Sequence, residues 1–201
     1  MQEADGTPRS LHSMAHEQKP LEAHRLGPDA RHRRVAIYRA GCGLRWRAHR
    51  QQIGGDGAQG KVHGIDYSEE SVAASRRYNA QAIRAGRVEI HLADVEKLPF
   101  PDNTFDLVTG VETHFWWPDI AAGLREIRRV LKPGGALVLI AEVYKGADAF
   151  VSRVCEKSAL VTGMKMLTPD EHRDLLTSAG FADVRIDPLA AKGWITAQGR
   201  K

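Results

Sequence analysis

The chain of 201 residues is long enough for one α/β domain with a substantial core and too short for two. Its 42% hydrophobic and 27% charged residues are ordinary for a globular protein, and its net charge of +4 arises entirely in the first 60 residues. That basic segment lacks the aromatic interleaving of nucleic-acid-binding sites, so we expect no nucleic-acid partner.

The two cysteines, Cys42 and Cys155, are too few for a disulfide framework or a metal site. No apolar run reaches the roughly 18 residues that a membrane-spanning helix needs. No basic stretch followed by an apolar run marks a secretory signal. We therefore expect a cytoplasmic protein with no metal and no membrane partner; the sequence leaves its oligomeric state open.

The first apolar run, residues 35–38, leads into Gly41-Cys42-Gly43. A nucleotide-binding α/β domain needs a first strand that enters a glycine-rich turn, because glycine lets the backbone approach the ligand closely. Gly41 and Gly43 are therefore candidate cofactor-binding residues. Large side chains at residues 44–46 fill the rest of the turn, so we expect the first strand and glycine loop to be degenerate.

From residue 61 onward, strand and helix patterns alternate. Apolar runs bounded by turn residues predict strands over residues 62–65, 88–92, 105–111, 136–143, 184–187 and 194–197. Caps, early acids and terminal glycines predict helices over residues 69–85, 120–131 and 169–180. This alternation indicates a parallel sheet with helices on both of its faces.

Two carboxylates follow neighbouring strands of this pattern. Asp66 comes directly after the strand at 62–65, and Asp94 follows the strand at 88–92. A parallel α/β sheet presents such acids at its carboxyl edge, where nucleosides bind, and the two oxygens of Asp66 suit the paired hydroxyls of a ribose. The alternatives are that Asp66 is only the N-terminal acid of a helix and that Asp94 is a solvent-facing turn residue.

Five segments, taken in order and spacing, carry a family resemblance. They are Gly64-Ile65-Asp66-Tyr67-Ser68, Ala93-Asp94, Leu98-Pro99-Phe100-Pro101-Asp102, Phe105-Asp106-Leu107-Val108 and Leu131-Lys132-Pro133-Gly134-Gly135. On these segments, residues 61–201 resemble class I S-adenosylmethionine (SAM)-dependent methyltransferases of the small-molecule type 11 kind.

The resemblance implies a Rossmann-like, doubly wound α/β fold. Its sheet would be seven-stranded and mostly parallel, with helices on both faces and an antiparallel last strand. The implied cofactor is SAM, with Asp66 on the ribose, Tyr67 beside the ribose or adenine, Asp94 accepting from the adenine amino group, and Ala93 and Val95 packing near the ring. The implied reaction is methyl transfer to a small-molecule acceptor.

The segment after the fourth predicted strand, residues 110–119, would lie where this family binds the methyl acceptor. Trp116 and Trp117 are predicted to cover an apolar or cationic acceptor with Glu112 nearby, and His114 is a candidate general base. The alternative is that the aromatic residues belong to the core and that His114 is a structural hydrogen-bonder. No catalytic triad is expected, because the sulfonium is already activated and positioning supplies much of the rate.

Three polar features are predicted to be structural or solvated. Lys132-Pro133-Gly134-Gly135 is predicted to stop a helix and turn the chain into a strand. Glu126, with the arginines around it, is expected on a solvated helix face, and so is His172.

The first sixty residues depart from the family, because Arg39 stands where the family has an acid. Read one base out of frame, with the free middle base of each codon chosen to fit, the codons of residues 39–58 permit VLDVGCGGGRTVNKLAAMA. That string contains the missing acid and glycines in order. We interpret residues from about 19 to 58 as an out-of-frame translation, which makes residues 1–33 a disordered or non-native segment and residues 34–201 the methyltransferase domain, degenerate over 34–58.

Two other functions are alternatives to methyl transfer. A dinucleotide oxidoreductase would need a G-x-G-x-x-G turn after the first strand, which is absent from the chain as written and from its shifted translation. A catalytically inactive remnant or interaction module is the other alternative, since the damaged glycine segment would weaken the cradle for the methionine end of SAM.

Overall fold

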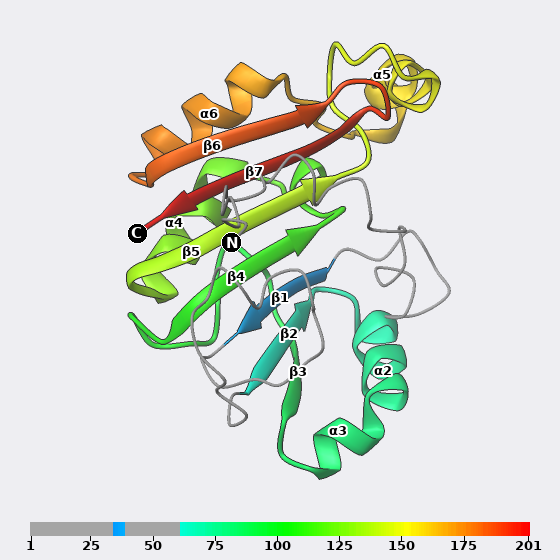
Figure 1. Cartoon of the computed structure of the whole chain (residues 1–201). Coiled ribbons are helices and arrows are strands. Elements are labelled where there is room, and N and C mark those ends of the chain that lie inside the picture. Colours follow the sequence, from blue (N-terminus) through cyan, green and yellow to red (C-terminus); the bar gives the residue numbers. More distant parts are fainter. Residues whose placement is uncertain (1–33, 39–60) are drawn as a thin grey trace, which may run out of the picture.

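The computed structural model describes residues 34–38 and 61–201 (Figure 1). The predictions for Gly41 and Gly43, and those for residues 1–33 and 39–58, lie outside the described residues. The described strands are β1 (Arg34–Tyr38), β2 (Val62–Asp66), β3 (Val88–Leu92), β4 (Phe105–Val111), β5 (Leu131–Ala141), β6 (Ala182–Leu189) and β7 (Trp194–Arg200). The described helices are α2 (Glu69–Tyr78), α3 (Ala80–Arg84), α4 (Ile120–Val130), α5 (Phe150–Thr162) and α6 (Pro169–Ser178), with a 3-10 turn, η2, at His114–Trp116.

The strands form one mixed α/β sheet in the order β3-β2-β1-β4-β5-β7-β6. β2 pairs with β3 and β4 pairs with β5 in parallel, as predicted for strands that are joined through helices. β7 lies antiparallel between β5 and β6, which confirms the antiparallel last strand. The β2–β3 pair places the carboxyl ends of these strands side by side, at the edge where Asp66 ends β2 and Asp94 comes two positions after β3.

β1 departs from the expected parallel arrangement, because it runs antiparallel to both of its neighbours. Tyr38, its last residue, pairs with Val62 at the start of β2, so β1 ends at the opposite sheet edge from Asp66. A short apolar run predicts that a strand forms but not its direction, which depends on the connection that follows. That connection lacks the glycine turn and helix pattern of the family, and the prediction of a mostly parallel sheet fails at this strand.

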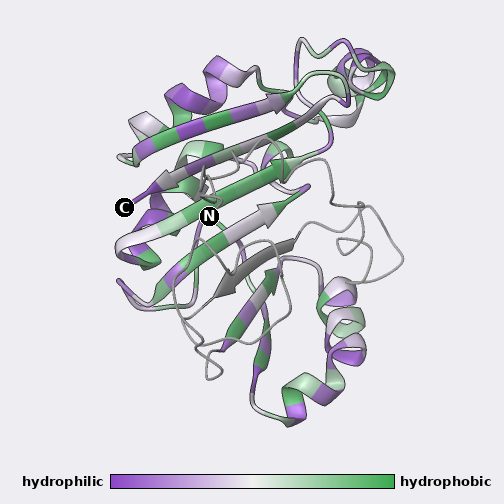
Figure 2. Ribbon diagram, viewed as in Figure 1, coloured by the Kyte–Doolittle hydropathy of each residue, from purple (hydrophilic) through white to green (hydrophobic). Residues whose placement is uncertain are grey.

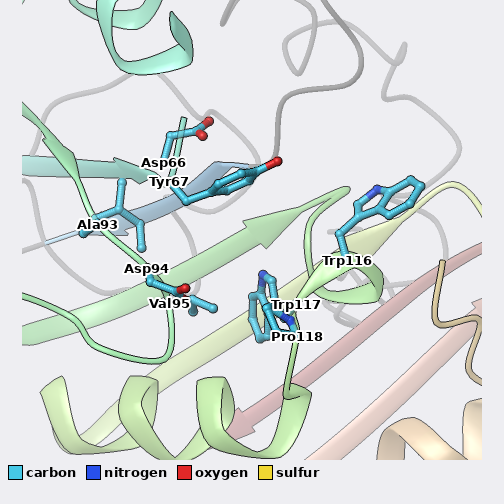
Figure 3. A pocket seen from close by; sticks show the side chains of 9 residues that line it. Asp66, Tyr67, Ala93, Asp94, Val95, Trp116, Trp117 and Pro118 are labelled. Atoms are coloured by element: carbon cyan, nitrogen blue, oxygen red, sulfur yellow. The ribbon is translucent and has the colours of Figure 1, made fainter. Parts of the chain in front are cut away.

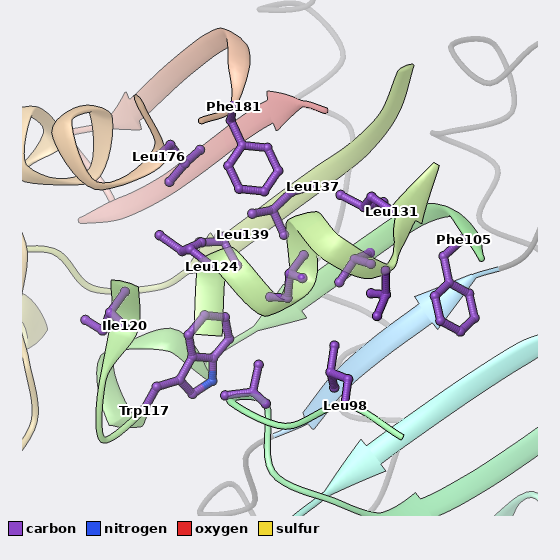
Figure 4. Close-up of a cluster of buried hydrophobic side chains, with 14 of the residues drawn as sticks. Leu98, Phe105, Trp117, Ile120, Leu124, Leu131, Leu137, Leu139, Leu176 and Phe181 are labelled. Carbon is purple, nitrogen blue, oxygen red and sulfur yellow. The ribbon is translucent and has the colours of Figure 1, made fainter. Parts of the chain in front are cut away.

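The core lies between the sheet and the amphipathic helix α4. Its buried positions, Ile120, Gly123, Leu124, Ile127 and Val130, follow the three- and four-residue spacing of one helix face. They pack with side chains from β4, β5 and α6, including Phe105, Leu131, Leu137 and Leu176 (Figure 4). The alternation of polar and apolar residues along β6, against the apolar run of β5, is visible in Figure 2.

Several elements differ from the sequence prediction in their bounds. The predicted helix over residues 69–85 is divided at Asn79 into α2 and α3. β5 begins directly after α4 and so includes the Lys-Pro-Gly-Gly segment, within which Gly134 adopts a positive φ of 78°. The sequence prediction omits α5, because Ala149 provides no side-chain cap for this helix and no acid lies in its first turn.

α6 forms where the sequence predicts it. The Thr168 side chain accepts from the backbone N–H of Glu171, and the Glu171 carboxylate accepts from that of Thr168, so both halves of a capping box are present. Pro169 occupies the first turn, where its missing N–H has no helical partner to lose. No helix in the described part of the chain combines the length and apolarity needed to cross a bilayer.

Candidate functional site

A pocket opens at the carboxyl edge of the sheet, between the ends of β2 and β3 and the segment that follows β4 (Figure 3). Its lining residues are Ile65, Asp66, Tyr67, Ala93, Asp94, Val95, Trp116, Trp117 and Pro118. The structure therefore brings together every predicted cofactor-binding residue within the described chain and both predicted acceptor-covering tryptophans. Glu112 and His114 do not line it.

The strand wall of the pocket consists of the last residues of β2 and the residues that come just after β2 and β3. Asp66 is 3% exposed, and its Oδ1 accepts from the Ser68 backbone N–H at 2.9 Å, a contact that fixes the carboxylate at the start of α2. The Ala93 N–H donates to the Asp66 carbonyl at 3.0 Å, so the two strand ends are joined. Asp94 is exposed, and its Oδ1 accepts from the Glu96 N–H at 2.9 Å. Two carboxylates thus flank an apolar wall to which Val95 contributes.

The aromatic wall of the pocket consists of residues 116–118. Trp117 is only 4% exposed and belongs to the main core cluster, whereas Trp116 is half-buried. Gly123 on α4 makes room for the Trp117 indole, because a Cβ at that position would lie 2.9 Å from Trp117 Cε3 and 3.3 Å from Val95 Cγ1. Trp117 thus belongs to the core, as the alternative held, and also lines the pocket; its contact with the acceptor stays a prediction.

The two walls are linked through α4. The Glu96 carboxylate accepts from the Asp119 backbone N–H at 2.6 Å, and the Asp119 side chain caps α4 by accepting from Ala122 N at 2.9 Å. The loop after β3 and the segment before α4 are consequently held together on the side of the pocket where its two walls meet.

Glu112 joins the ends of two central strands. Its N–H donates to the Ile140 carbonyl at 2.9 Å, its Oε1 accepts from the Glu142 N–H, and its φ of 55° lies in the left-handed region. Burial raises the pKa of the Glu112 carboxyl to about 7, and the Glu142 charge adds to the rise while the hydrogen bond from the Glu142 backbone opposes it. Glu112 therefore holds a titratable proton near neutrality at the sheet edge.

His114 is 2% exposed and forms a buried pair with His172, with their Nε2 atoms 2.9 Å apart. The His172 Nδ1 lies 2.7 Å from the Thr168 carbonyl, which can only accept, so His172 Nδ1 donates. His172 Nε2 is then the acceptor of the pair and His114 Nε2 the donor. This leaves His114 Nδ1 as a bare acceptor, buried and without a hydrogen-bond partner among the described residues.

Burial lowers the pKa of His114 to about 3, with a smaller contribution from the charge of His172. Burial also lowers the pKa of His172, against the effect of the Thr168 carbonyl. Both rings are consequently neutral at pH 7. The pair connects α6 to the segment that carries the aromatic wall, and the His114 ring packs edge-on against Phe115 and Trp117.

Two predictions of solvated helix faces were wrong. His172 is 2% exposed rather than on the surface, and its position four residues before the buried Leu176 is the sequence signal that could have placed it on the inner face of α6. Glu126 accepts from the Leu98 N–H at 2.9 Å and from Arg129, which in turn donates to the Leu98 and Phe100 carbonyls. These two residues fix the turn-rich loop before β4 instead of facing solvent.

The chain matches a family described as the methyltransferase domain, type 11, over residues 39–139. It is 44% identical over 39% of its length to the ubiquinone/menaquinone biosynthesis C-methyltransferase of Geobacter sulfurreducens, and the match covers 31% of that protein. It is 31% identical over 78% of its length to a sterol 24-C-methyltransferase of Gibberella zeae, with 42% of that protein covered. The chain thus spans about a third to two fifths of the length of these relatives.

Among solved structures, the fold is similar to that of a SAM-dependent methyltransferase, a possible histamine N-methyltransferase, from Thermotoga maritima. The TM-score is 0.58 at 21% identity, with 68% of this chain and 72% of that chain covered, and this likeness concerns the fold alone. The family match covers half of the chain and includes the residues of the strand wall. The chain therefore belongs to the SAM-dependent methyltransferase family of type 11.

Proposed function

We propose that this protein transfers the methyl group of SAM to a small-molecule acceptor, with the cofactor's nucleoside in the pocket between the strand wall and the aromatic wall. The observation that supports this most strongly is the convergence of two carboxylates, from adjacent parallel strands, on one apolar pocket. Proteins of this fold class bind nucleosides at the carboxyl edge of the sheet.

The donor set of the pocket fits the nucleoside half of SAM. Asp66 offers two oxygens to the ribose hydroxyls, and Tyr67 stands beside it in the lining. Asp94 offers an acceptor for the adenine amino group, while Ala93 and Val95 give the ring an apolar surface. Gly41 and Gly43 remain predicted contacts for the methionine end.

When bound, SAM supplies an activated methyl group on a positively charged sulfur. This chain's part is to orient that methyl and to exclude water from it. Trp116, Trp117 and Pro118 provide an aromatic and apolar wall that suits an apolar ring or a cationic acceptor. An apolar acceptor also agrees with the quinone and sterol substrates in the names of the relatives. Glu112 comes directly after β4 and outside the pocket lining, and its contact with the acceptor stays a prediction.

The geometry favours a positioning role for His114 over that of a general base. A base must reach the proton that it takes, and His114 is buried outside the pocket lining with a pKa of about 3. Its pairing with His172 instead fixes the segment from which Trp116 and Trp117 project. A base role would show as an activity loss in His114→Gln that added base rescues, whereas a positioning role predicts a raised KM for the acceptor without rescue.

An inactive remnant remains the second candidate, and the direction of β1 supports it. The last residue of β1, Tyr38, pairs with Val62 at the start of β2, whereas Asp66 stands at the end of β2. β1 therefore ends at the sheet edge opposite the pocket. The family's glycine turn, by contrast, lies next to the cofactor. The direction of β1 affects only the part of the site that would hold the methionine end of SAM, because the nucleoside pocket is formed by β2, β3 and the segment after β4.

Calorimetric titration of SAM separates the two candidates. The chain as written is compared with a version whose residues 39–57 are replaced by VLDVGCGGGRTVNKLAAMA. We expect the restored version to bind SAM and the chain as written to bind at least about tenfold more weakly, as loss of backbone contacts to the ligand predicts. If neither binds while circular dichroism shows both to be folded, the methyltransferase proposal is wrong; if only the restored version binds, the chain as written is an impaired member.

A further inference from the structure

A cluster of metal-binding side chains lies on β2 and β3, away from the pocket. His63, Glu89 and His91 project from the same face of the sheet, because the register pairs His63 with Glu89 and Ile65 with His91. His63 precedes Asp66 by three residues, which corresponds to about 10 Å along a strand. The nucleoside pocket and this cluster therefore share two strands but occupy separate places on them.

Three donor atoms of the cluster form a nearly equilateral triangle. His63 Nδ1 lies 3.1 Å from His91 Nε2, and Glu89 Oε2 lies 3.4 Å from the first and 3.6 Å from the second. A tetrahedral zinc ion with bonds of about 2.0 to 2.1 Å holds its ligand atoms about 3.3 to 3.5 Å apart. The triangle thus has the size of one face of a zinc coordination tetrahedron.

We infer that His63, Glu89 and His91 form a binding site for a divalent transition-metal ion of the zinc type. Two imidazoles and one carboxylate are nitrogen and oxygen ligands that zinc, cobalt and nickel accept, while magnesium and calcium favour oxygen alone. The side chains of Glu89 and His91 are 43% and 30% exposed, so a water molecule has access to the fourth position.

The surroundings of the cluster order the two imidazoles before a metal arrives. The His63 ring packs edge-on against Phe100 and Phe105, with centroids 5.3 and 5.5 Å away, and the His91 ring packs against Phe100 at 5.1 Å. The two rings share a nitrogen–nitrogen hydrogen bond, in which one of the two nitrogens carries the proton. Metal binding requires that ring to change to its other tautomer, which moves the proton to its second nitrogen, so that both facing nitrogens can direct a lone pair at the ion. Less side-chain freedom is lost on binding than in a set of mobile surface histidines.

Lys61 opposes the metal. Its ammonium pairs with the Oε1 oxygen of Glu89, while the histidines approach Oε2, so one carboxylate oxygen stays with Lys61 and the other is directed toward the imidazoles. A positive charge this close weakens the attraction for a divalent cation. Removing the charge of Lys61 should therefore raise the metal affinity, whereas removing a ligand should lower it.

The test uses Co²⁺, whose visible absorption reports tetrahedral coordination, and Zn²⁺ as its competitor, on the untagged full chain freed of metal. Five further histidines and Cys42 lie outside the described residues, so the result is a difference between variants. We expect His91→Ala and Glu89→Gln each to lose one equivalent of tetrahedrally coordinated Co²⁺. The affinity of this site for Co²⁺ should fall at least about 100-fold, because only two ligands remain. Leu92→Ala on the same strand and Glu70→Gln on α2 are the matched controls and should retain it.

Lys61→Met is expected to raise the affinity about three- to tenfold at low ionic strength. Zn²⁺ at about 100 times its dissociation constant should raise the melting temperature of the unsubstituted chain by roughly 5 to 10 °C, and this shift should vanish in His91→Ala. Cobalt binding that is absent, or equally strong and unchanged in spectrum in both ligand variants, overturns the inference. So does a Lys61→Met affinity that is unchanged or lower, because Glu89 would then not contact the metal.

Discussion

The two walls of the pocket are built in different ways. The strand wall consists of residues at the carboxyl ends of two parallel strands, with Asp66 as the last residue of β2 and Asp94 two positions after β3, and short backbone contacts fix it. The aromatic wall, with Trp117, depends on packing against helices: Gly123 on α4 leaves space for the indole, and His172 on α6, distant in sequence, binds His114. The first wall follows from local structure, whereas the second requires the packed core, so the two should respond differently to substitution.

Trp117→Ala is the substitution with the largest expected effect, because it removes a 4% exposed indole from the core as well as from the pocket. The free energy of unfolding should fall by about 3 to 5 kcal/mol, as measured by urea denaturation. Trp116→Ala, at a half-buried position of the same wall, is the control and should cost less than about 1 kcal/mol. Similar losses for the two variants would mean that the aromatic wall is not part of the core.

Asp66→Asn tests the strand wall. The amide keeps the acceptor for the Ser68 N–H but loses the charge and one acceptor offered to the ribose, so SAM affinity should fall about 10- to 100-fold, or about 1.4 to 2.8 kcal/mol. Calorimetric titration measures the dissociation constant for SAM on whichever form of the chain binds it, and urea denaturation of the same variant checks that it is folded. Asp170→Asn on the exposed start of α6 serves as the control. An unchanged dissociation constant would remove Asp66 from the cofactor site.

His172→Leu tests the support of the aromatic wall from behind. It leaves the His114 Nε2–H buried without its acceptor, which should lower the free energy of unfolding by about 1 to 3 kcal/mol. Replacing both histidines by leucine removes donor and acceptor together, so the double variant should be more stable than His172→Leu. If the double variant loses the sum of both single losses, the pair does not stabilise the fold through its hydrogen bond.

Glu112→Gln should have the smallest effect on the free energy of unfolding, and the size of this effect depends on pH. The folded-state pKa of about 7 lies above the ordinary value of 4.5, so the protonated carboxyl stabilises the fold fully below pH 4.5, and this contribution is lost as the pH rises through 7. The variant should therefore gain about 1 kcal/mol at pH 8 and nothing at pH 4, as measured by urea denaturation at both pH values. An equal change at both pH values would show that Glu112 does not titrate near neutrality.

The neighbouring His114 has the opposite pH dependence. Its pKa is lowered from 6.5 to about 3, so its contribution to stability is present above pH 6.5 and lost as the pH falls toward 3. His114→Gln should flatten the acid limb of the stability profile and leave the limb above pH 7 unchanged.

The contrast between the walls also explains what the sequence could predict. An acid directly after a buried strand is a local pattern, and the parallel register of β2 and β3 brings Asp66 and Asp94 to one edge without further information. α4, β7 and the capped start of α6 follow from equally local periodicity and capping. These elements needed no knowledge of what packs against them.

The failures share a different origin. His172 was expected on a surface because one histidine on a helix does not reveal the buried partner that lies 58 positions away. The start of β5 depends on its pairing with β4, where Leu131 lies opposite Phe105. α5 lacks both the side-chain cap that starts each of the predicted helices and an acid in its first turn. The direction of β1 could not be predicted from its five residues, because the connection that follows decides it.

Gly123 lies outside the pocket lining but contacts two of its side chains, Trp117 and Val95. A methyl group at that position would collide with Trp117 and lie tight against Val95, and both of these side chains line the pocket, so even alanine would shift its lining. The side chains at positions 123 and 117 therefore compete for the same space, so that a larger residue at one position requires a smaller residue at the other. Among natural relatives these two positions should vary together, and paired exchanges there offer a way to retune acceptor selectivity without altering any group that touches the cofactor's polar atoms.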